Sequence, residues 1–303
     1  MMTLNLGNLA TFRLVIQRGS FSAAADALGL SQPAVSLQIR QLEQFLQTRL
    51  VERTGRGVNA TAAGLALLNY GDRIEHVVDE AICSVRAFSH EISGSVTIGT
   101  GATACIHLLP PLLQQLRQDH PQLRVGVTTG NTLDIVRAVE ENRLDIGLVT
   151  LPASSRSLDV TPILDEEFVC IFARGQGDGI SQLTPHVLHT LPLIAFESGS
   201  GTRALIDGWF QASALTVSPV MQLGSIEAIK RMVRAGLGFS IVPRMAVQHA
   251  SDREGLTVFS LDPILHRQLA IVMRQDKILS KGIAEAIRLL RQEASGLRYQ
   301  EVE

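Results

Sequence analysis

Apolar residues at helical spacing open the chain and predict a first helix. Leu9, Phe12 and Val15 recur at steps of three, with Ile16 beside them. This spacing places them on one face of an α-helix. Gly19 follows directly, and a glycine just beyond the last periodic residue commonly ends a helix.

Two further short helices are expected before residue 47. Ser22 is a candidate cap for the second, which is rich in alanine and ends at Gly29. Ser31 is a good cap for the third, over residues 34–46, and Pro33 falls in the first turn, where its missing N–H costs nothing. Two short helices joined by a tight turn that contains glycine form a helix-turn-helix.

The predicted third helix has an apolar face and a polar face. The apolar stripe, at steps of four, three and four, consists of Val35, Ile39, Leu42 and Leu46. The polar stripe consists of Gln32, Ser36 and Arg40, flanked by Pro33 and Leu37. Gln can bind adenine and Arg can bind guanine in the major groove of DNA, so this stripe suits a recognition helix. A merely solvated helix face is the alternative.

A basic hairpin is expected after the third helix. Residues 50–53 read as a short strand, residues 53–57 as a glycine-rich turn, and residues 58–61 as the return. A hairpin of this kind beside a helix-turn-helix is a wing, in which Arg53 and Arg56 would contact phosphate or the minor groove.

These motifs together resemble one family. The matching positions are Gly19-Ser-Phe-Ser-Ala-Ala-Ala, Leu28, Ser31-Gln-Pro-Ala-Val-Ser36, Gln38-Ile39, Leu42-Glu43, Leu50, Arg53, Arg56, Val58, Thr61 and Ala63-Gly64. They closely resemble the LysR-type transcriptional regulators. The predicted DNA-binding residues are Ser31, Gln32, Pro33, Ser36, Leu37, Arg40, Arg53 and Arg56. Two scaffold positions depart from the family, since Gln47 replaces its usual glycine and Val51 its usual phenylalanine.

A heptad pattern runs along residues 62–90, behind a possible cap at Thr61. Its members, at alternating steps of four and three, are Leu67, Gly71, Ile74, Val78, Ala81, Val85 and Phe88. Such a seam predicts two helices packed closely in a dimer. An amphipathic helix lying on its own domain is the alternative. The resemblance favours the dimer, because LysR-type regulators pair through this helix and often form tetramers.

Strand and helix patterns alternate from residue 94 onward, which predicts an α/β domain with a largely parallel sheet. Strands are expected at 95–99, 123–128, 145–149, 158–173, 191–196, 220–223, 239–242 and 268–272, and helices near 106–118, 131–141, 202–212, 226–235 and 283–294. The overall class is therefore α/β, with a winged helix-turn-helix (1–61), a linker and dimerisation helix (62–90) and an effector-binding domain (91–303). The resemblance implies a two-lobed, type II periplasmic-binding-protein-like fold, with lobe I at 91–162 and 268–303 and lobe II at 163–267.

Ligands of open α/β sheets bind beyond the carboxyl ends of the strands, where helix N-termini present free N–H groups. Hydroxyls and glycines gather at four such places. The predicted effector-binding residues are Thr100, Gly101, Ala102, Thr103, Thr128, Thr129, Ser198, Ser200, Gly201, Thr202, Arg203 and Ser225. We expect a small anion there, with Arg203 adding a bidentate charge pair. Ordinary capping is the alternative for any one segment.

The sequence shows no catalytic constellation. The segment Ser198-Gly-Ser-Gly, preceded by Glu197, does not match the Gly-x-Ser-x-Gly motif of a nucleophile elbow. The histidines lack the spacing of metal ligands. We therefore expect no enzyme activity, metal or cofactor. Cys83, Cys105 and Cys170 lie far apart and are expected to be small buried residues. A redox sensor at Cys105 is the nearest rival with chemistry.

Composition and charge agree with a DNA-binding head on a larger body. The 303 residues are 46% hydrophobic, enough for two or more globular units, and no apolar run approaches the roughly 20 residues that a membrane crossing needs. No secretory signal opens the chain, so a cytoplasmic location is expected. Residues 1–60 hold six basic and three acidic side chains, a net charge of +3, and the remainder holds 21 and 26, a net charge of −5.

The predicted function is transcription regulation by a homodimer or homotetramer. Its partners would be a double-stranded DNA operator and a small anionic effector, with RNA polymerase as a further candidate and no membrane. The rival is a solute-binding or enzyme domain with an incidental N-terminal helical region. The intact winged motif and the missing signal peptide argue against that rival.

Overall fold

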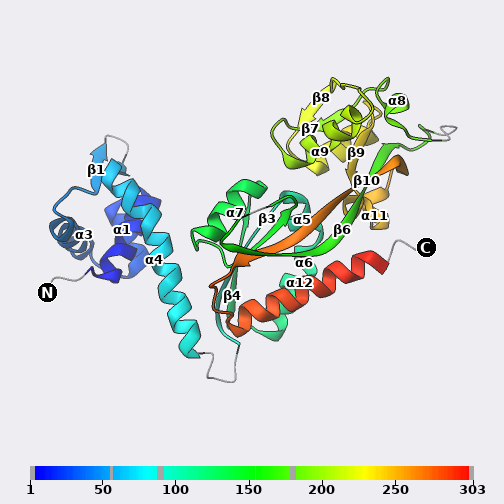
Figure 1. The fold of residues 1–303 in the computed structure, drawn as a ribbon. Coiled ribbons are helices and arrows are strands. Elements are labelled where there is room, and N and C mark those ends of the chain that lie inside the picture. The colour runs from blue at the N-terminus through cyan, green and yellow to red at the C-terminus, as the bar shows by residue number, and fades with distance from the viewer. Residues whose placement is uncertain (1–3, 55–56, 87–91, 154, 178–181, 300–303) are drawn as a thin grey trace. The chain divides into compact units, whose positions relative to one another are not determined.

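The computed structural model describes residues 4–54, 57–86, 92–153, 155–177 and 182–299. The chain forms two compact units, Met1–Asp79 and Glu80–Glu303. Figure 1 labels their helices and strands in chain order. Within the described residues, no helix combines the length and the apolar character needed to cross a membrane.

The first unit is a winged helix-turn-helix. Its elements are α1 (Leu6–Arg18), α2 (Phe21–Leu28), α3 (Gln32–Leu46), β1 (Val51–Thr54), β2 (Gly57–Ala60) and the start of α4 (Ala62–Arg86). β1 and β2 pair antiparallel, with Val51 opposite Ala60. The core of this unit contains Leu9, Phe12, Val15, Phe21, Ala24, Ala25, Val35, Ile39, Leu42, Leu50 and Val58.

The helix ends confirm most of the expected caps. Gly19 ends α1 in the left-handed conformation with φ of 63°, and the Ser31 hydroxyl accepts the Ala34 N–H at 3.3 Å. The expectation for Ser22 was wrong, because the N-cap of α2 is Ser20, whose hydroxyl accepts the Ala23 N–H at 3.3 Å. The helix therefore begins at Phe21, and Ser22 is inside its first turn.

The heptad stripe of α4 packs partly on its own unit. Leu67 and Ile74 contact the core of the first unit, and Gly71 lies against Leu9 and the Arg13 side chain. The alternative of an amphipathic helix lying on its own domain therefore holds for this half of the stripe. Predicted seam residue Phe88 lies outside the described residues.

The second unit is built on a six-stranded sheet in the order β4-β3-β5-β10-β6-β9, with a smaller sheet of β7 and β8. Its strands are β3 (Gly94–Thr100), β4 (Leu123–Thr129), β5 (Ile146–Thr150), β6 (Leu158–Ala173), β7 (Ile194–Phe196), β8 (Met221–Leu223), β9 (Ser240–Pro243) and β10 (Leu256–Arg274). Its helices are α5 (Ala102–His107), α6 (Leu109–Asp119), α7 (Thr132–Glu140), α8 (Pro185–Leu188), α9 (Gly201–Gln211), α10 (Ile226–Arg234), η1 (Arg244–Val247), α11 (Ala250–Arg253) and α12 (Lys281–Tyr299).

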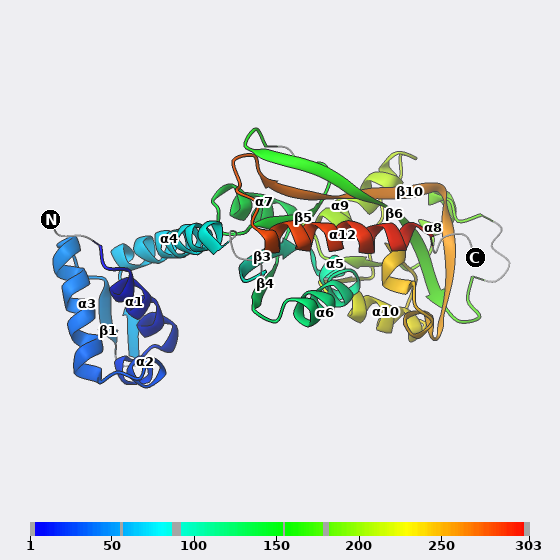
Figure 2. The same ribbon diagram turned by 90° about the horizontal axis from the view of Figure 1, so that it is seen from below.

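Two long strands join the lobes of this unit. β6 and β10 pair antiparallel over most of their length and run side by side from lobe I to lobe II (Figures 1 and 2). β3 is parallel to β4 and β5, whereas β10 is antiparallel to β5 and β6. The large sheet is thus mixed, and the expectation of a largely parallel sheet holds for β3, β4 and β5 and for the separate pair β7 and β8. Sequence periodicity found the last part of β10 but missed its start at Leu256.

Each lobe has its own apolar core. In lobe II the core lies among β6, β7, β9, α9 and α10, and in lobe I it lies among β3, β5, α6 and α12. The single tryptophan, Trp209, is buried in lobe II and donates its indole N–H to the Pro263 carbonyl at 2.8 Å. The two cores hold the strands and the helices packed on them, and these elements position the loops that follow β3, β4, β5, β7 and β8.

Candidate functional site

The recognition helix α3 turns its polar stripe outward. Gln32, Leu37 and Arg40 are exposed and Ser36 is half-buried, whereas Val35 on the opposite face is fully buried. The predicted neighbours Ser31 and Pro33 are exposed at the start of the same helix. Outward-facing amide, hydroxyl, guanidinium and methyl groups are the side chains that can read base edges.

A buried carboxylate ties the wing to this helix. Glu43 is 8% exposed, and its Oε1 accepts the N–H groups of Leu50 at 2.9 Å and Val51 at 3.4 Å. The Arg49 guanidinium lies 3.2 Å from the other carboxylate oxygen of Glu43. The start of β1 therefore has a fixed position relative to α3.

The other strand of the wing is held by the turn between α1 and α2. The Val58 N–H donates to the Gly19 carbonyl at 3.0 Å, and a Cβ on Gly57 would approach that same oxygen to 2.8 Å. Arg53 lies in β1 opposite Val58, and Arg56 falls outside the described residues.

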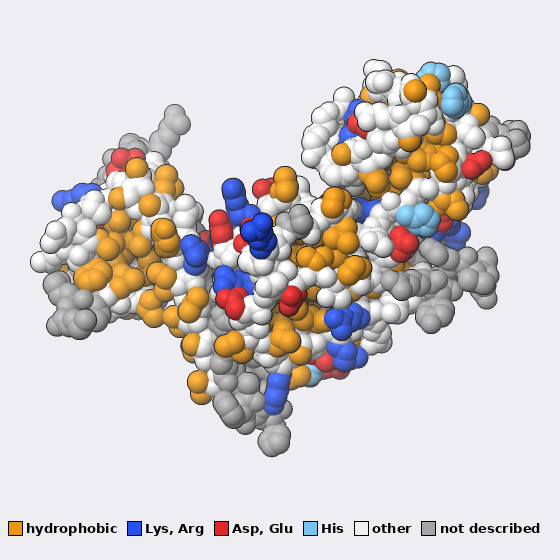
Figure 3. All heavy atoms as spheres, viewed as in Figure 1, with side chains coloured by type: hydrophobic (Ala, Val, Ile, Leu, Met, Phe, Trp, Pro, Cys, Tyr) orange, Lys and Arg blue, Asp and Glu red, His pale blue; other side chains and the backbone are white. Residues whose placement is uncertain are grey.

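The second candidate site is a cavity between the two lobes of the second unit, with a volume of about 760 Å³. The space-filling view shows the surface hollowed between the lobes (Figure 3). Nine of the predicted effector-binding residues line it: Thr100, Gly101, Ala102, Thr103, Thr129, Ser198, Ser200, Gly201 and Thr202. They follow β3, β4 and β7, whose carboxyl ends meet at this cavity as the topology of parallel strands requires.

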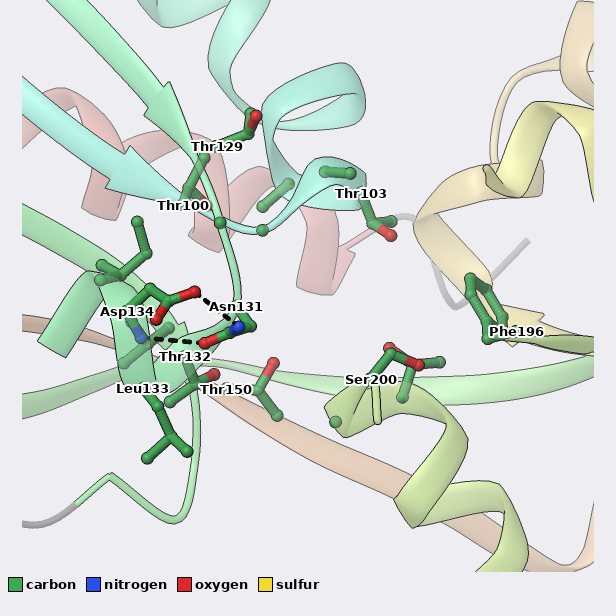
Figure 4. Close-up of a pocket in the computed structure, with 18 of the residues that line it drawn as sticks. Thr100, Thr103, Thr129, Asn131, Thr132, Leu133, Asp134, Thr150, Phe196 and Ser200 are labelled. Carbon is green, nitrogen blue, oxygen red and sulfur yellow. Dashed lines mark hydrogen bonds between the residues drawn. The ribbon is translucent and has the colours of Figure 1, made fainter. Parts of the chain in front are cut away.

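The hydroxyl groups of the cavity divide into used and available donors. Thr100 donates to the Leu148 carbonyl at 3.0 Å, and Ser198 donates to Gln222 at 2.8 Å. Thr103, Thr129 and Thr150 have no hydrogen bond from their hydroxyls to any other described residue. Figure 4 shows these three side chains, from lobe I, on one side of the cavity and Phe196 and Ser200, from lobe II, on the other.

The charged groups of the cavity have both signs. Asp134 accepts a hydrogen bond from the Asn131 amide at 2.7 Å, and Glu197 lies against Gly224. Arg267 extends from β10 with its Nε 2.6 Å from Glu166 Oε2. These are the ionisable groups among the described lining residues.

The Glu166 carboxylate is deeply buried behind Arg267. Burial raises the pKa of Glu166, and the Arg267 guanidinium partly opposes that shift. The Arg267 guanidinium also lies 5.3 Å from the centre of the Phe168 ring. The Nε of Arg267 therefore donates to Glu166, and the Arg267 side chain also forms part of the cavity wall.

Three predicted effector-binding residues lie off the cavity lining. Arg203 was expected to bind an anion, but its Nε donates to both oxygens of Asp207, at 2.8 and 2.9 Å, and its NH1 donates to the Phe196 carbonyl. Ser225 caps α10 by accepting the Ala228 N–H. Thr128 lies in edge strand β4, one residue before the lining begins.

Sequence reasoning missed several lining residues. Thr132 comes shortly after β4 and Thr150 is the last residue of β5, so the strand-end rule could have found them. Phe196 and Leu269 give the cavity an apolar wall, and they carried no signal because they read as core strand residues. Arg267 carried none either, since its partner Glu166 is 101 positions away in the chain.

Comparisons with known proteins match both units. The family described as "Bacterial regulatory helix-turn-helix protein, lysR family" matches residues 6–65, and "LysR substrate binding domain" matches residues 89–295. A probable RuBisCO transcriptional regulator of Chlorokybus atmophyticus is 32% identical, covering 91% of each chain. The uncharacterised regulator YusT of Bacillus subtilis is 30% identical, covering 91% of this chain and 92% of its own.

Solved structures share the fold. Full-length CbnR, in a crystal structure with its target DNA, is similar with a TM-score of 0.75 and 21% identity, covering 96% of this chain and 100% of its own. The chain belongs to the LysR family of bacterial transcriptional regulators, with a DNA-binding helix-turn-helix domain and an effector-binding domain.

Proposed function

We propose that α3 reads a DNA operator through Gln32, Ser36 and Arg40, with Ser31, Pro33 and Leu37 completing the contact surface. The observation that carries this proposal is the division of α3 into a buried apolar face and an outward polar face. Arg53 and Arg56 in the wing supply phosphate contacts. Phosphate contacts position a protein on DNA, whereas contacts to base edges give specificity.

Two substitutions separate these roles in a gel-shift titration with the DNA upstream of the chain's own gene. Arg40→Ala should weaken specific binding by about 1–3 kcal/mol and non-specific binding much less. Arg56→Ala should weaken both similarly and make binding less dependent on salt. Equal behaviour of the two variants would overturn the assignment, and no salt-sensitive, sequence-specific shift by the wild type would overturn DNA reading itself.

We propose further that the inter-lobe cavity binds a small organic anion that controls the regulator. Arg267 supports an anionic group, aided by the available hydroxyls of Thr103, Thr129 and Thr150. The apolar wall supports an organic body, and the volume of about 760 Å³ is in the range of small-molecule sites. The carboxylates of Asp134 and Glu197, which also line the cavity, disfavour a second negative charge on the effector.

Matched probes test this proposal by thermal shift of the full chain. Benzoate and hexanoate should raise the melting temperature, whereas benzamide and hexanamide, of nearly equal shape without charge, should not. Arg267→Lys should reduce the response, because lysine lacks the planar fork of arginine. Arg203→Lys is the control and should respond like the wild type. Equal shifts with acids and amides, or no shift with any acid, would exclude an anionic effector of this class.

We also propose a homodimer through α4, with tetramers built from such dimers. Because Leu67 and Ile74 pack inside the first unit, the contact uses the remaining exposed apolar side chains of α4. These include Tyr70, Val77, Ile82 and Val85. Val77→Glu should shift the mass measured by light scattering toward the monomer, and an unchanged mass would remove this face from the interface.

A further inference from the structure

A buried histidine at the end of α5, in lobe I, faces a carboxylate of lobe II. The His107 side chain, on α5 of lobe I, is 7% exposed, and its Nε2 is buried with no hydrogen-bond partner. That nitrogen lies 3.8 Å from Glu227 Oε1, on α10 of lobe II. A buried polar atom without a partner is costly, so this position calls for a physical explanation.

The carboxylate that faces His107 belongs to a charge cluster around a buried lysine, and it is itself 42% exposed. Lys230 is fully buried, and its Nζ lies 2.8 Å from Glu227 Oε1, 2.8 Å from the Ala246 carbonyl and 3.1 Å from Asp252 Oδ1. The Lys230 ammonium thus stands between two carboxylates. Glu227 can also accept a hydrogen bond from a protonated His107.

Other charged groups near His107 are few. His249, which precedes α11, is close enough to disfavour a second positive charge. Arg244 of η1, which also packs against α5, is bound to Glu167 at 2.7 Å. The groups that attract a proton to His107 are therefore Glu227 and Asp252, and those that oppose it are Lys230 and His249.

The pair is also connected to the cavity. Helix α5 begins at Ala102 and α10 begins at Ile226, and both residues line the cavity. His107 and Glu227 lie further along the same two helices, whose labels appear in Figure 2. A movement of one lobe toward the other therefore changes the cavity and the distance from His107 to Glu227 together.

We propose that His107 and Glu227 form a proton-sensitive latch between the lobes: protonated His107 donates to the Glu227 carboxylate and draws the lobes together, and neutral His107 leaves them free to separate. Burial first, and Lys230 second, hold the pKa of His107 below its usual 6.5, so the imidazole is neutral at pH 7.5. When the pH falls through this lowered pKa, the imidazole takes up one proton. A charge-assisted hydrogen bond is about 2.8 Å long, so forming it closes the present gap of 3.8 Å.

The test measures the distance between the lobes without any effector, so it does not depend on the effector class proposed above. Exposed Gln118 on α6 and exposed Gln211 on α9 are each replaced by a ketone-bearing amino acid that carries a spin label. Labelled full-length chain is diluted in unlabelled chain, so that pulsed electron resonance reports distances within one chain. Between pH 7.5 and pH 5.5 the wild-type distance should shorten and its distribution should narrow.

Three variants decide the origin of that response. His107→Gln should keep the pH 7.5 distance at both pH values. Glu227→Gln should also lose the response. Its amide oxygen can still accept a hydrogen bond from Lys230, so this variant is expected to fold. His120→Gln is the matched control, because His120 lies 3.8 Å from Glu285 within lobe I, and it should respond like the wild type. An unchanged or longer wild-type distance at pH 5.5, or a full response in His107→Gln, would overturn the latch.

Discussion

Arg267 and Glu166 face each other across the two strands that join the lobes, with Arg267 Nε 2.6 Å from Glu166 Oε2. Both side chains are almost completely buried, at 6% and 4% exposure. The Glu166 carboxylate also accepts the Met245 N–H from η1 at 3.4 Å. The wall of the cavity, the joining strands and η1 are therefore connected through one ion pair.

Removing the cation of this pair should destabilise the second unit strongly. In Arg267→Met the Glu166 carboxylate loses its partner while staying buried, which typically costs about 3–5 kcal/mol. Urea unfolding at pH 7.5, followed by the fluorescence of Trp209, measures the loss in this unit. The control is Arg143→Met, because Arg143 and its partner Glu141 are 37% and 41% exposed, and it should cost no more than about 1 kcal/mol.

The loss in Arg267→Met should depend on pH in a defined direction. A carboxyl whose pKa is higher in the folded state than in the unfolded state stabilises the fold most below the unfolded pKa, and the benefit is lost as pH rises through the folded pKa. Burial already raises the pKa of Glu166, and removal of Arg267 raises it further. The variant should thus recover stability relative to the wild type as pH falls toward 5. A loss that is constant with pH would mean that Glu166 does not remain buried.

The same pair shows where sequence reasoning stops. Rules about strand ends found Thr100, Thr129 and Ser200 because those residues lie at or shortly after the ends of their own strands. Arg267 and Glu166 become neighbours only when β6 and β10 pair, and no local pattern reports that pairing. Arg203 was assigned to the cavity for its charge and its place in a segment that follows a strand, although Asp207, one helical turn onward, is a competing partner visible in the sequence.

Gly64 is expected to be indispensable for the first unit. A Cβ at this position would lie 2.2 Å from the Leu50 carbonyl oxygen, and a backbone atom cannot move aside as a side chain can. Gly64→Ala must therefore displace the start of α4 from β1, at a cost of about 3 kcal/mol. Circular dichroism during thermal unfolding should show an earlier loss of helix, with weaker DNA binding. Ala62→Ser, at an exposed neighbour, should change neither property.

Gln47 is expected to limit stability at the end of α3. It adopts a left-handed conformation with φ of 52°, which costs a side chain with a Cβ about 1 kcal/mol and costs glycine little. Gln47→Gly should therefore stabilise the first unit by up to that amount, measured by urea unfolding. Gln47→Ala retains the Cβ and should bring no such gain. Equal stability of the glycine and alanine variants would contradict the backbone explanation.

The fold itself was mostly accessible from local patterns. Caps such as Ser31, glycine stops such as Gly19 and the alternation of strands and helices are set by neighbouring residues, and they gave elements close to those observed. The stripe on α4 was ambiguous, because a heptad repeat fits Leu67 and Ile74 equally well against a second chain or against their own core. Long-range packing decided that question.

His107 should give the second unit a pH-dependent stability. The unfolded chain binds a proton on this residue near pH 6.5, whereas burial, followed by Lys230, lowers the pKa of His107 in the folded state. Between the two pKa values the unfolded state holds more protons, so the free energy of unfolding falls as pH drops below 6.5. Neutral His107 therefore contributes stability above pH 6.5 that is lost as pH falls through the folded pKa. Urea unfolding of the wild type and His107→Gln from pH 8 to pH 5, followed by Trp209 fluorescence, should show a smaller decline in the variant. Exposed His189→Gln should decline like the wild type, and parallel curves for wild type and His107→Gln would show that His107 titrates normally in the fold.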